Sequence, residues 1–321
     1  MVRYYKYHHE HAKKINAQGS FEEEMNKILK HQIFVIMSGL IMLSLYFFLL
    51  PTTHLNLDFT LLSKANPILL ISFLLISTLG ISHGAFDGKI IWESGSKKNA
   101  FILYLIYISI SLLGLMLWLI SPTLWLFILL AISTIHFGHS DLAYIDNRQK
   151  YLKYSWGLAM TFMPVLFHPS NVSEIFYLLT DSNAISPTLI FLKYLISLNL
   201  ILLTSYIIFN LFKTKDKIYF LLTGELTIMI ILGYYLHPLV WFAFYFCILH
   251  GIRALINYNF NFFSDTLWLI LFTAPITLII IYMNLDLSLE GFLFVFPILA
   301  CLTIAHMLLP KIISFSKTKV I

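Results

Sequence analysis

Charged side chains are scarce in this chain. Only 12% of its 321 residues are Asp, Glu, Lys or Arg, whereas 59% are hydrophobic. A soluble domain carries about 25% charged residues, and the mean hydropathy of this chain is strongly positive at +0.82. The shortage of charge excludes a soluble globular protein. It predicts a multi-pass protein of the cell (inner) membrane.

Cysteine is nearly absent as well. The chain contains Cys247 and Cys301 alone, and both fall inside predicted membrane spans. This placement excludes a disulfide framework and a CxxC metal motif.

The formal net charge of +5 is spread over loops and termini, so we expect no nucleic-acid partner. The lipid bilayer is the partner that the composition predicts.

Apolar stretches of about 20 residues recur along the chain, separated by short polar breaks, as membrane-spanning helices require. We therefore expect an all-α fold, a polytopic transmembrane helix bundle of about ten spans. The predicted spans are 32–50, 67–86, 100–120, 122–139, 156–168, 188–212, 218–236, 238–256, 266–283 and 291–310. The expected regions are a polar, basic cytoplasmic N-terminal tail at 1–31, the transmembrane bundle at 32–313, and a short cytoplasmic tail at 314–321. The N-terminal tail is not a cleavable signal peptide, because it precedes a full-length span.

The basic residues give an independent check on this topology. With ten spans, all but two of the 21 Lys and Arg residues fall on one side of the bilayer, and the two exceptions are Lys64 and Lys193. Basic residues concentrate in cytoplasmic loops. Both termini are therefore predicted to be cytoplasmic.

Four histidines fall within spans that run in the same direction across the membrane: His83, His136, His250 and His306. Each lies about 12 to 16 residues from the start of its span, so all four sit roughly 18–24 Å from the same surface. Ionisable groups inside membrane spans are rare and costly, which makes each one a functional candidate. Neutral imidazoles at one depth suit a shared metal ion, such as iron, zinc, copper or nickel. The alternative interpretation is that each ring hydrogen-bonds to a neighbouring helix.

Two carboxylates and a further histidine lie close to these rings in the sequence. Asp87 follows His83 by one helical turn, and His139 and Asp141 follow His136. A carboxylate beside a liganding imidazole accepts its second N–H and fixes its tautomer, so Asp87, His139 and Asp141 are candidates for supporting a metal site. The alternative is that they mark the cytoplasmic interface.

Four short strings resemble the Brp/Blh family of membrane-embedded bacterial and archaeal β-carotene 15,15′-dioxygenases. They are residues 80–87 (GISHGAFD), 135–141 (IHFGHSD), 245–253 (YFCILHGIR) and 305–309 (AHMLL), in the family's order. The resemblance implies a non-haem Fe(2+) enzyme that uses O₂ to split the central double bond of β-carotene into two all-trans-retinal molecules. It also implies that His83, His136 and His250 are metal ligands.

The resemblance has two departures. The family often has a second histidine four residues after the third ligand, where this chain has Ala254, and Ser82 replaces its usual proline. His306 is the replacement ligand that depth suggests. No side-chain nucleophile or base stands out, so the metal centre is expected to carry the chemistry. A functional link to a retinal-binding rhodopsin is a further expectation.

Three other classes of protein stay open at this point. A transporter or proton relay would also use buried His and Asp residues, although no internal repeat of the kind typical of transporters is evident. A bis-histidine haem protein would pair two of the rings. A catalytically altered assembly factor for a retinal protein is the third alternative, and Ala254 is its main hint.

Overall fold

The computed structural model describes residues 2–49, 72, 75, 76, 84, 86–94, 96–182, 185–258, 261–282 and 289–318. All the regular elements within these residues are helices, which confirms the predicted all-α fold. They are α1 (Val2–Leu49), α4 (Asp87–Glu93), α5 (Lys97–Ile120), α6 (Pro122–Asp141), α7 (Lys150–Phe167), α8 (Pro169–Thr180), α9 (Ile185–Thr214), α10 (Lys217–Tyr235), α11 (Pro238–Ala243), the π-helix η3 (Phe244–Gly251), α12 (Ile252–Asn257), α13 (Phe262–Tyr282) and α14 (Leu289–Thr318).

Seven helical segments of the described chain are long and apolar enough to cross a membrane. They are Met25–Phe48, Lys97–Ile120, Pro122–Asp141, Pro187–Thr214, Lys217–Tyr235, Pro238–Asn257 and Phe296–Ser314. Their outer faces carry large exposed apolar side chains, such as Phe48 at 82% and Phe212 at 77% exposure, which suits contact with lipid and not with water. The predicted span 67–86 lies almost entirely outside the described residues, and α13 corresponds to span 266–283. The count of ten spans and the cytoplasmic termini stay predictions.

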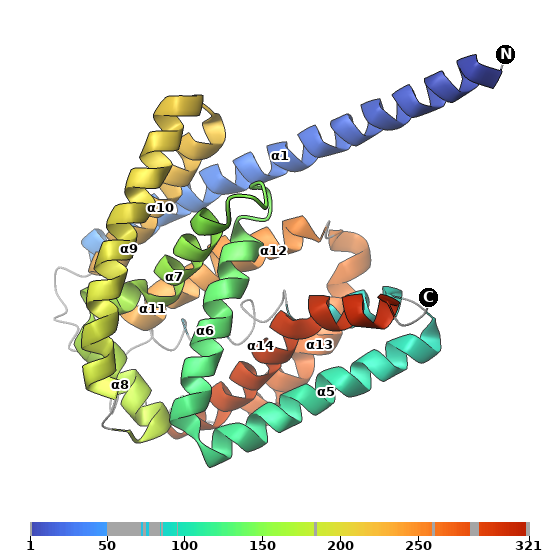
Figure 1. Ribbon diagram of the computed structural model, residues 1–321. Coiled ribbons are helices and arrows are strands. Elements are labelled where there is room, and N and C mark those ends of the chain that lie inside the picture. The colour runs from blue at the N-terminus through green and yellow to red at the C-terminus, as the bar shows by residue number, and fades with distance from the viewer. Residues whose placement is uncertain are drawn as a thin grey trace.

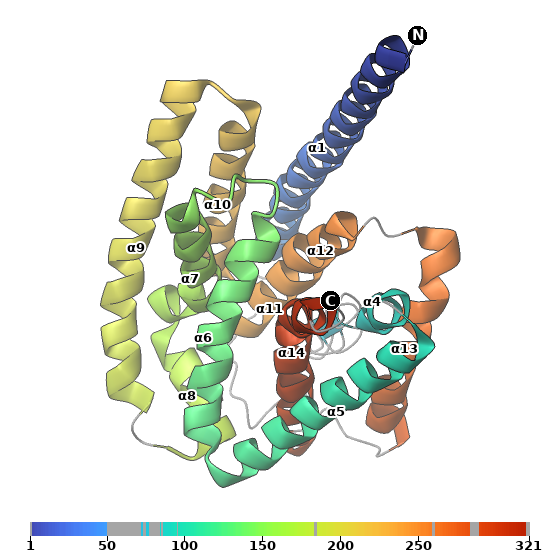
Figure 2. The ribbon, with the colours of Figure 1, turned by 45° about the vertical axis from the view of Figure 1, so that its right-hand side comes forward.

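Helix α1 runs without a break from the polar N-terminal segment into the first span. Its N-terminal part extends away from the other helices, and its apolar part packs against α10 (Figure 1). The segment predicted as a polar, basic N-terminal tail is therefore helical from Val2 onward. At another side of the bundle, α5 and α14 pack against each other (Figure 2).

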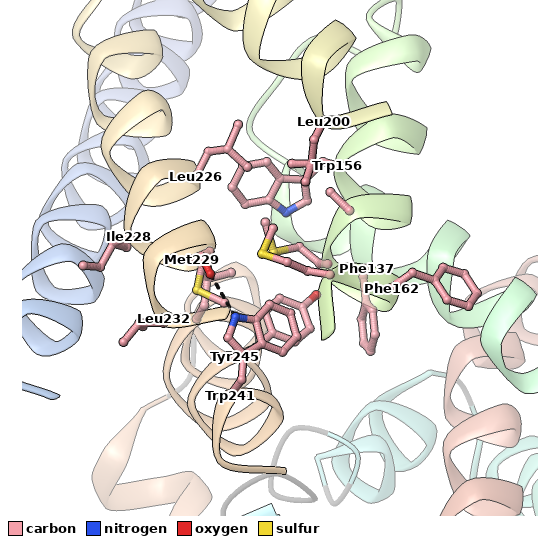
Figure 3. Close-up of a cluster of buried hydrophobic side chains, with 14 of the residues drawn as sticks. Phe137, Trp156, Phe162, Leu200, Leu226, Ile228, Met229, Leu232, Trp241 and Tyr245 are labelled. Carbon is pink, nitrogen blue, oxygen red and sulfur yellow. Dashed lines mark hydrogen bonds between the residues drawn. The ribbon is translucent and has the colours of Figure 1, made fainter. Parts of the chain in front are cut away.

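Helix α7 lies at the centre of the bundle, where it packs against α6, α9, α10 and α8. Its side chains Trp156, Ala159 and Met160 are fully buried. This helix begins at Lys150, before the start of the predicted span 156–168. Figure 3 shows the aromatic core beside it, where Trp241 donates a hydrogen bond of 3.0 Å from Nε1 to the carbonyl oxygen of Met229. Trp241 also stacks on Tyr245.

Two glycines allow α6 and α7 to touch along their backbones. A Cβ atom at Gly138 would lie 1.9 Å from the carbonyl oxygen of Lys153, and one at Gly157 would lie 1.8 Å from that of Thr134. Only a residue without a Cβ fits such contacts. This close packing brings Trp156 of α7 within reach of the end of α6.

The span predicted as one helix at 238–256 has three parts. It begins as α11, with Pro238 in its first turn, continues as the π-helix η3 and ends as α12. The wider π-turn changes the direction of the side chains that follow it, and such segments occur frequently at functional sites. His250 is the penultimate residue of η3.

Candidate metal centre

Three of the four predicted histidines converge in the core, from three different helices. The ring centroid of His136 on α6 lies 5.2 Å from that of His250 on η3 and 5.1 Å from that of His306 on α14. His250 is fully buried and His306 is 5% exposed. Segments more than 100 residues apart in the sequence thus bring their imidazoles together. We call these three rings the histidine cluster.

Two rings of the cluster are each hydrogen-bonded to a carboxylate of their own. Nδ1 of His250 lies 2.7 Å from Oδ1 of Asp141. Nδ1 of His306 lies 2.9 Å and 2.8 Å from the two carboxylate oxygens of Asp87. An ionised carboxylate only accepts hydrogen bonds, so opposite such a group Nδ1–H is the donor, and a neutral ring then has its lone pair on Nε2. This is the arrangement that metal-ligating histidines show most often.

Asp141 is itself held by two aromatic side chains. Its Oδ2 accepts a 3.1 Å hydrogen bond from Nε1 of Trp156 and a 2.9 Å hydrogen bond from the hydroxyl of Tyr245. Asp141 is fully buried, and a buried carboxylate is costly unless several donors satisfy its oxygens. With Nδ1 of His250 it has three side-chain donors, so its position is fixed from three directions.

Asp87 lies in α4, outside the seven apolar spans. Burial raises the pKa of its carboxyl group, and the His306 ring beside it opposes that rise. The two side chains are only 3% and 5% exposed, so the pair is screened from water. Gly84 also lies against this pair, since a Cβ there would be 3.8 Å from Cγ of His306.

A buried ion pair lies behind Asp141. Arg253 of α12 is fully buried, and its Nη2 donates to Oε1 of Glu225 on α10, which is also fully buried. The Nη1 atom of Arg253 lies 3.4 Å from the backbone carbonyl oxygen of Asp141. Arg253 was counted among the cytoplasmic basic residues in the prediction of topology. Its guanidinium is buried in the interior, where it joins α12, α10 and the end of α6.

Helix α1 completes this network with two side chains that the sequence interpretation missed. Nδ1 of His31 accepts from Nε of Arg253 at 3.3 Å, while its Nε2 lies 3.0 Å from the carbonyl oxygen of Ile248 in η3. Nε2 of Gln32 donates to Oε2 of Glu225 at 3.2 Å. Both residues stand at the border between the polar and apolar parts of α1, where the sequence gives no signal of a buried role.

The other predicted residues have different positions. His83 lies outside the described residues. His139 is exposed, with Nδ1 at 2.9 Å from the carbonyl oxygen of Ile135 and its ring against Tyr154. It lies at the surface of α6 and not beside a ring of the cluster. Asp87 and Asp141 each bond a histidine of a distant helix, namely His306 and His250.

The histidine cluster supplies imidazole nitrogens of the kind that bind a metal ion. Within the described residues, no group of three or more His, Cys, Asp or Glu side chains is gathered closely enough to hold a metal by itself. The ring of His136 nevertheless lies close to both others, with centroids 5.2 Å from that of His250 and 5.1 Å from that of His306. Nε2 of His136 is buried and has no hydrogen-bond partner among the described residues. Burying such an atom is costly unless a hydrogen-bond donor or a metal ion pairs with it. The residues present fit a metal centre that needs a further ligand or a small closure of the rings.

Comparison with known proteins bears on what this site does. The family model for "Beta-carotene 15,15'-dioxygenase" matches residues 74–314, about three quarters of the chain. The chain belongs to the β-carotene 15,15′-dioxygenase family. A relative of that name, from an uncultured marine bacterium 66A03, is 29% identical over 185 residues, which cover 56% of this chain and 65% of the relative. The chain thus aligns with somewhat less than two thirds of that relative. No solved structure matches.

The part of the chain that matches the β-carotene 15,15′-dioxygenase family contains the histidine cluster, both of its carboxylates and the Arg253–Glu225 pair. It begins after α1, so His31 and Gln32 lie outside it. The contacts of His31 with Arg253 and with η3 therefore add to the site from outside the matched region.

An apolar cavity of about 190 Å³ adjoins the cluster. It lies between α6, α7, α8, α11, η3 and α14. Phe246 lines it and stacks on the ring of His250, with the centroids 5.8 Å apart and the planes at 12°. A second cavity, of about 470 Å³, lies at another side of α14 and is lined by Asp87, Tyr104 and Cys301 among others. The site is thus bordered by space that an apolar molecule can occupy.

Proposed function

We propose that this protein cleaves the central 15,15′ double bond of β-carotene with O₂ inside the cell membrane, giving two molecules of all-trans-retinal. One C=C bond breaks and two C=O bonds form, and the two atoms of one O₂ molecule balance the reaction. The observation that carries the proposal is the histidine cluster with its two buried carboxylates, inside the apolar bundle of a chain of this family. The retinal formed there would be available to a rhodopsin in the same membrane.

We propose Fe(2+) as the metal, held by His136, His250 and His306. His83 is included as the fourth ligand because its neighbour Gly84 lies against His306. Neutral imidazoles leave the charge of the ion unchanged and suit iron. When bound, the iron would activate O₂ and orient the alkene.

The side chains around the histidine cluster orient its imidazole rings and exclude water from the site. Asp141 and Asp87 accept the Nδ1 protons of His250 and His306, so that Nε2 is the nitrogen of each ring that would bind the metal. Trp156 and Tyr245 keep Asp141 in place. Phe137 and Phe246 cover the His250 ring, at centroid distances of 4.7 Å and 5.8 Å. These rings exclude water, which protects reactive species from side reactions.

The experiment is expression in a host that makes β-carotene. Loss of the orange colour, with retinal detected by chromatography, would support the proposal, and purified protein with about one iron and no haem absorption band would support the cofactor. His136→Ala should abolish both retinal and bound iron. His139→Ala, which changes an exposed histidine one turn along the same helix, should abolish neither. Unchanged retinal formation by His136→Ala would refute the ligand assignment.

A further inference from the structure

The apolar cavity beside the histidine cluster begins within one helical turn of each ring. Ser133 precedes His136 by three residues on α6, and Thr303 precedes His306 by three residues on α14; both line the cavity. Phe246, which also lines it, stacks on His250. All three helices that carry the cluster therefore contribute to the mouth of the cavity nearest the rings.

The walls of the cavity are almost entirely hydrocarbon. The described lining contains no charged residue, and its polar side chains are Ser133, Thr161 and Thr303. Thr161 donates to the carbonyl oxygen of Gly157, and Thr303 to that of Leu299, each at 2.8 Å. Because these hydroxyls donate within their own helices, they are not directed at an occupant. A charged or strongly polar ligand would lose its hydration there without compensation. The walls suit an uncharged hydrocarbon.

The cavity extends away from the cluster along two helices. On α6 its lining runs from Phe137 back to Leu126, and on α14 from Thr303 back to Phe296. At 1.5 Å of rise per residue these distances are about 16 Å and about 10 Å. At the far end, Phe296 packs edge-on against Trp118, with centroids 5.9 Å apart. The space is therefore elongated, with one end at the cluster and the other at an aromatic wall.

We propose that this cavity holds one arm of the polyene substrate and that its depth determines which double bond lies at the histidine cluster. This inference rests on the proposed carotene cleavage. An arm that reaches the wall at Phe296 places a fixed number of carbon atoms between the wall and the cluster. Leu129 and Ala300, which are buried in the lining, then act as residues that determine the position of cleavage.

The test is to shorten or narrow the cavity from two different helices. Ala300→Leu on α14 and Leu129→Phe on α6 add bulk to the lining. The matched control is Leu124→Phe, because Leu124 lies on α6 and is 60% exposed. The purified wild type and variants are given β-carotene, the aldehyde products are separated by chromatography, and β-carotene binding is followed by the shift of its visible absorption band.

The larger side chains in these variants leave less depth for the polyene arm, which should shift outward. Cleavage then moves away from the central double bond and yields aldehydes of unequal length. We expect the ratio of unequal to equal aldehydes to rise about tenfold or more in both variants, since small changes of volume in an apolar pocket have effects of this size. Leu124→Phe should give the products of the wild type. A variant that is merely unstable would lose total product and would not change the site of cleavage.

Three other outcomes are decisive. If both variants form only retinal with the kcat/KM of the wild type, the inference is wrong and the proposed function stands. If the variants form no product, weaker β-carotene binding than in Leu124→Phe supports the inference, and equal binding refutes it. If the wild type itself forms no aldehyde, the proposed function fails, and the same comparison of binding decides whether the cavity holds the polyene.

Discussion

The imidazole of His250 and the carboxylate of Asp141 form a fully buried pair, with Nδ1 and Oδ1 2.7 Å apart. The two residues come from η3 and α6, and Asp141 is also bonded to Trp156 and Tyr245. The carboxylate therefore connects the histidine cluster to the aromatic core of the bundle.

The first prediction concerns this carboxylate. Asp141→Asn retains the size of the side chain but removes its charge, so it no longer fixes the tautomer of His250 or strengthens it as a ligand. We expect iron affinity or activity to fall about 10- to 100-fold, as is typical for the partner of a metal-ligating histidine. Iron content and retinal formation measure the effect. Asp146→Asn, at an exposed position of the following loop, is the control; equal iron affinity in the two variants would contradict the assigned role of Asp141.

The second prediction concerns the buried ion pair. Arg253→Met leaves Glu225 without its cation in the core, and breaking a buried pair in this way costs about 3–5 kcal/mol. Changing Glu225 to Gln in the same chain removes the uncompensated charge while retaining an acceptor for Gln32. The double variant should therefore recover much of the stability that Arg253→Met alone loses. Thermal unfolding in detergent provides the comparison, and purely additive losses would contradict a direct pairing.

The third prediction concerns the contact between α6 and α7. Gly138→Ala and Gly157→Ala each place a methyl group within 2 Å of a carbonyl oxygen, so the helices must separate. We expect a destabilisation of about 1–3 kcal/mol or more, together with loss of activity, because Trp156 would move away from Asp141. Gly114→Ala is the matched control, since its nearest contacts would be ordinary ones at 3.4–3.5 Å. An equal effect of all three changes on melting temperature and activity would refute the explanation.

The fourth prediction concerns pH. Nζ of Lys89 on α4 lies 2.6 Å from Oδ1 of Asp265 on α13. Burial opposes ionisation of Asp265, but hydrogen bonds led by that from Lys89 outweigh it and lower its pKa below the ordinary 3.8. A carboxyl whose pKa is lowered on folding stabilises the protein above its unfolded-state pKa and loses this contribution as the pH falls through the folded-state value.

The difference in melting temperature between the wild type and Asp265→Asn should therefore be constant between about pH 7 and pH 5 and should shrink below about pH 4. Glu93→Gln serves as the control, because Glu93 is 62% exposed and lies 3.8 Å from the same Lys89 nitrogen. Exposed pairs contribute little, so this variant should match the wild type throughout. A difference in melting temperature between the wild type and Asp265→Asn that grows below pH 4 would contradict the stabilising role of ionised Asp265.

Helix depth is the property of the site that the sequence could predict. Span boundaries and the fixed rise of an α-helix put His136, His250 and His306 at similar depths, and the structure brings these three rings together. The binding of metal by them stays a prediction. The rotation of each helix about its axis could not be predicted, because the spans are apolar on nearly every face. For the same reason, the partner of Asp141 was unforeseen: it is His250, which is 109 positions further along the chain.

The π-helix and the contacts of α1 were also beyond prediction. Residues 244–251 carry no local signal that distinguishes a π-turn from an α-turn, since both accept the same apolar side chains. His31 lies at the border between the polar and apolar parts of α1, where a histidine is unremarkable in sequence. Glu225, by contrast, stands within the predicted span 218–236, and a lone carboxylate in such a span was an available indication of a buried partner.

The Arg253–Glu225 pair has a consequence for biogenesis. Chains emerge from the ribosome N-terminus first, so α10 reaches the translocation machinery before α12 has been synthesised. Before Arg253 has been synthesised, the carboxyl of Glu225 lacks this cation. It is then expected to stay in contact with water inside the translocation machinery or with an insertase. Ribosome-stalled intermediates that end between these two helices should therefore be extracted from membranes more easily than those that include Arg253. The guanidinium thus stabilises the chain in the membrane at a late stage of its integration.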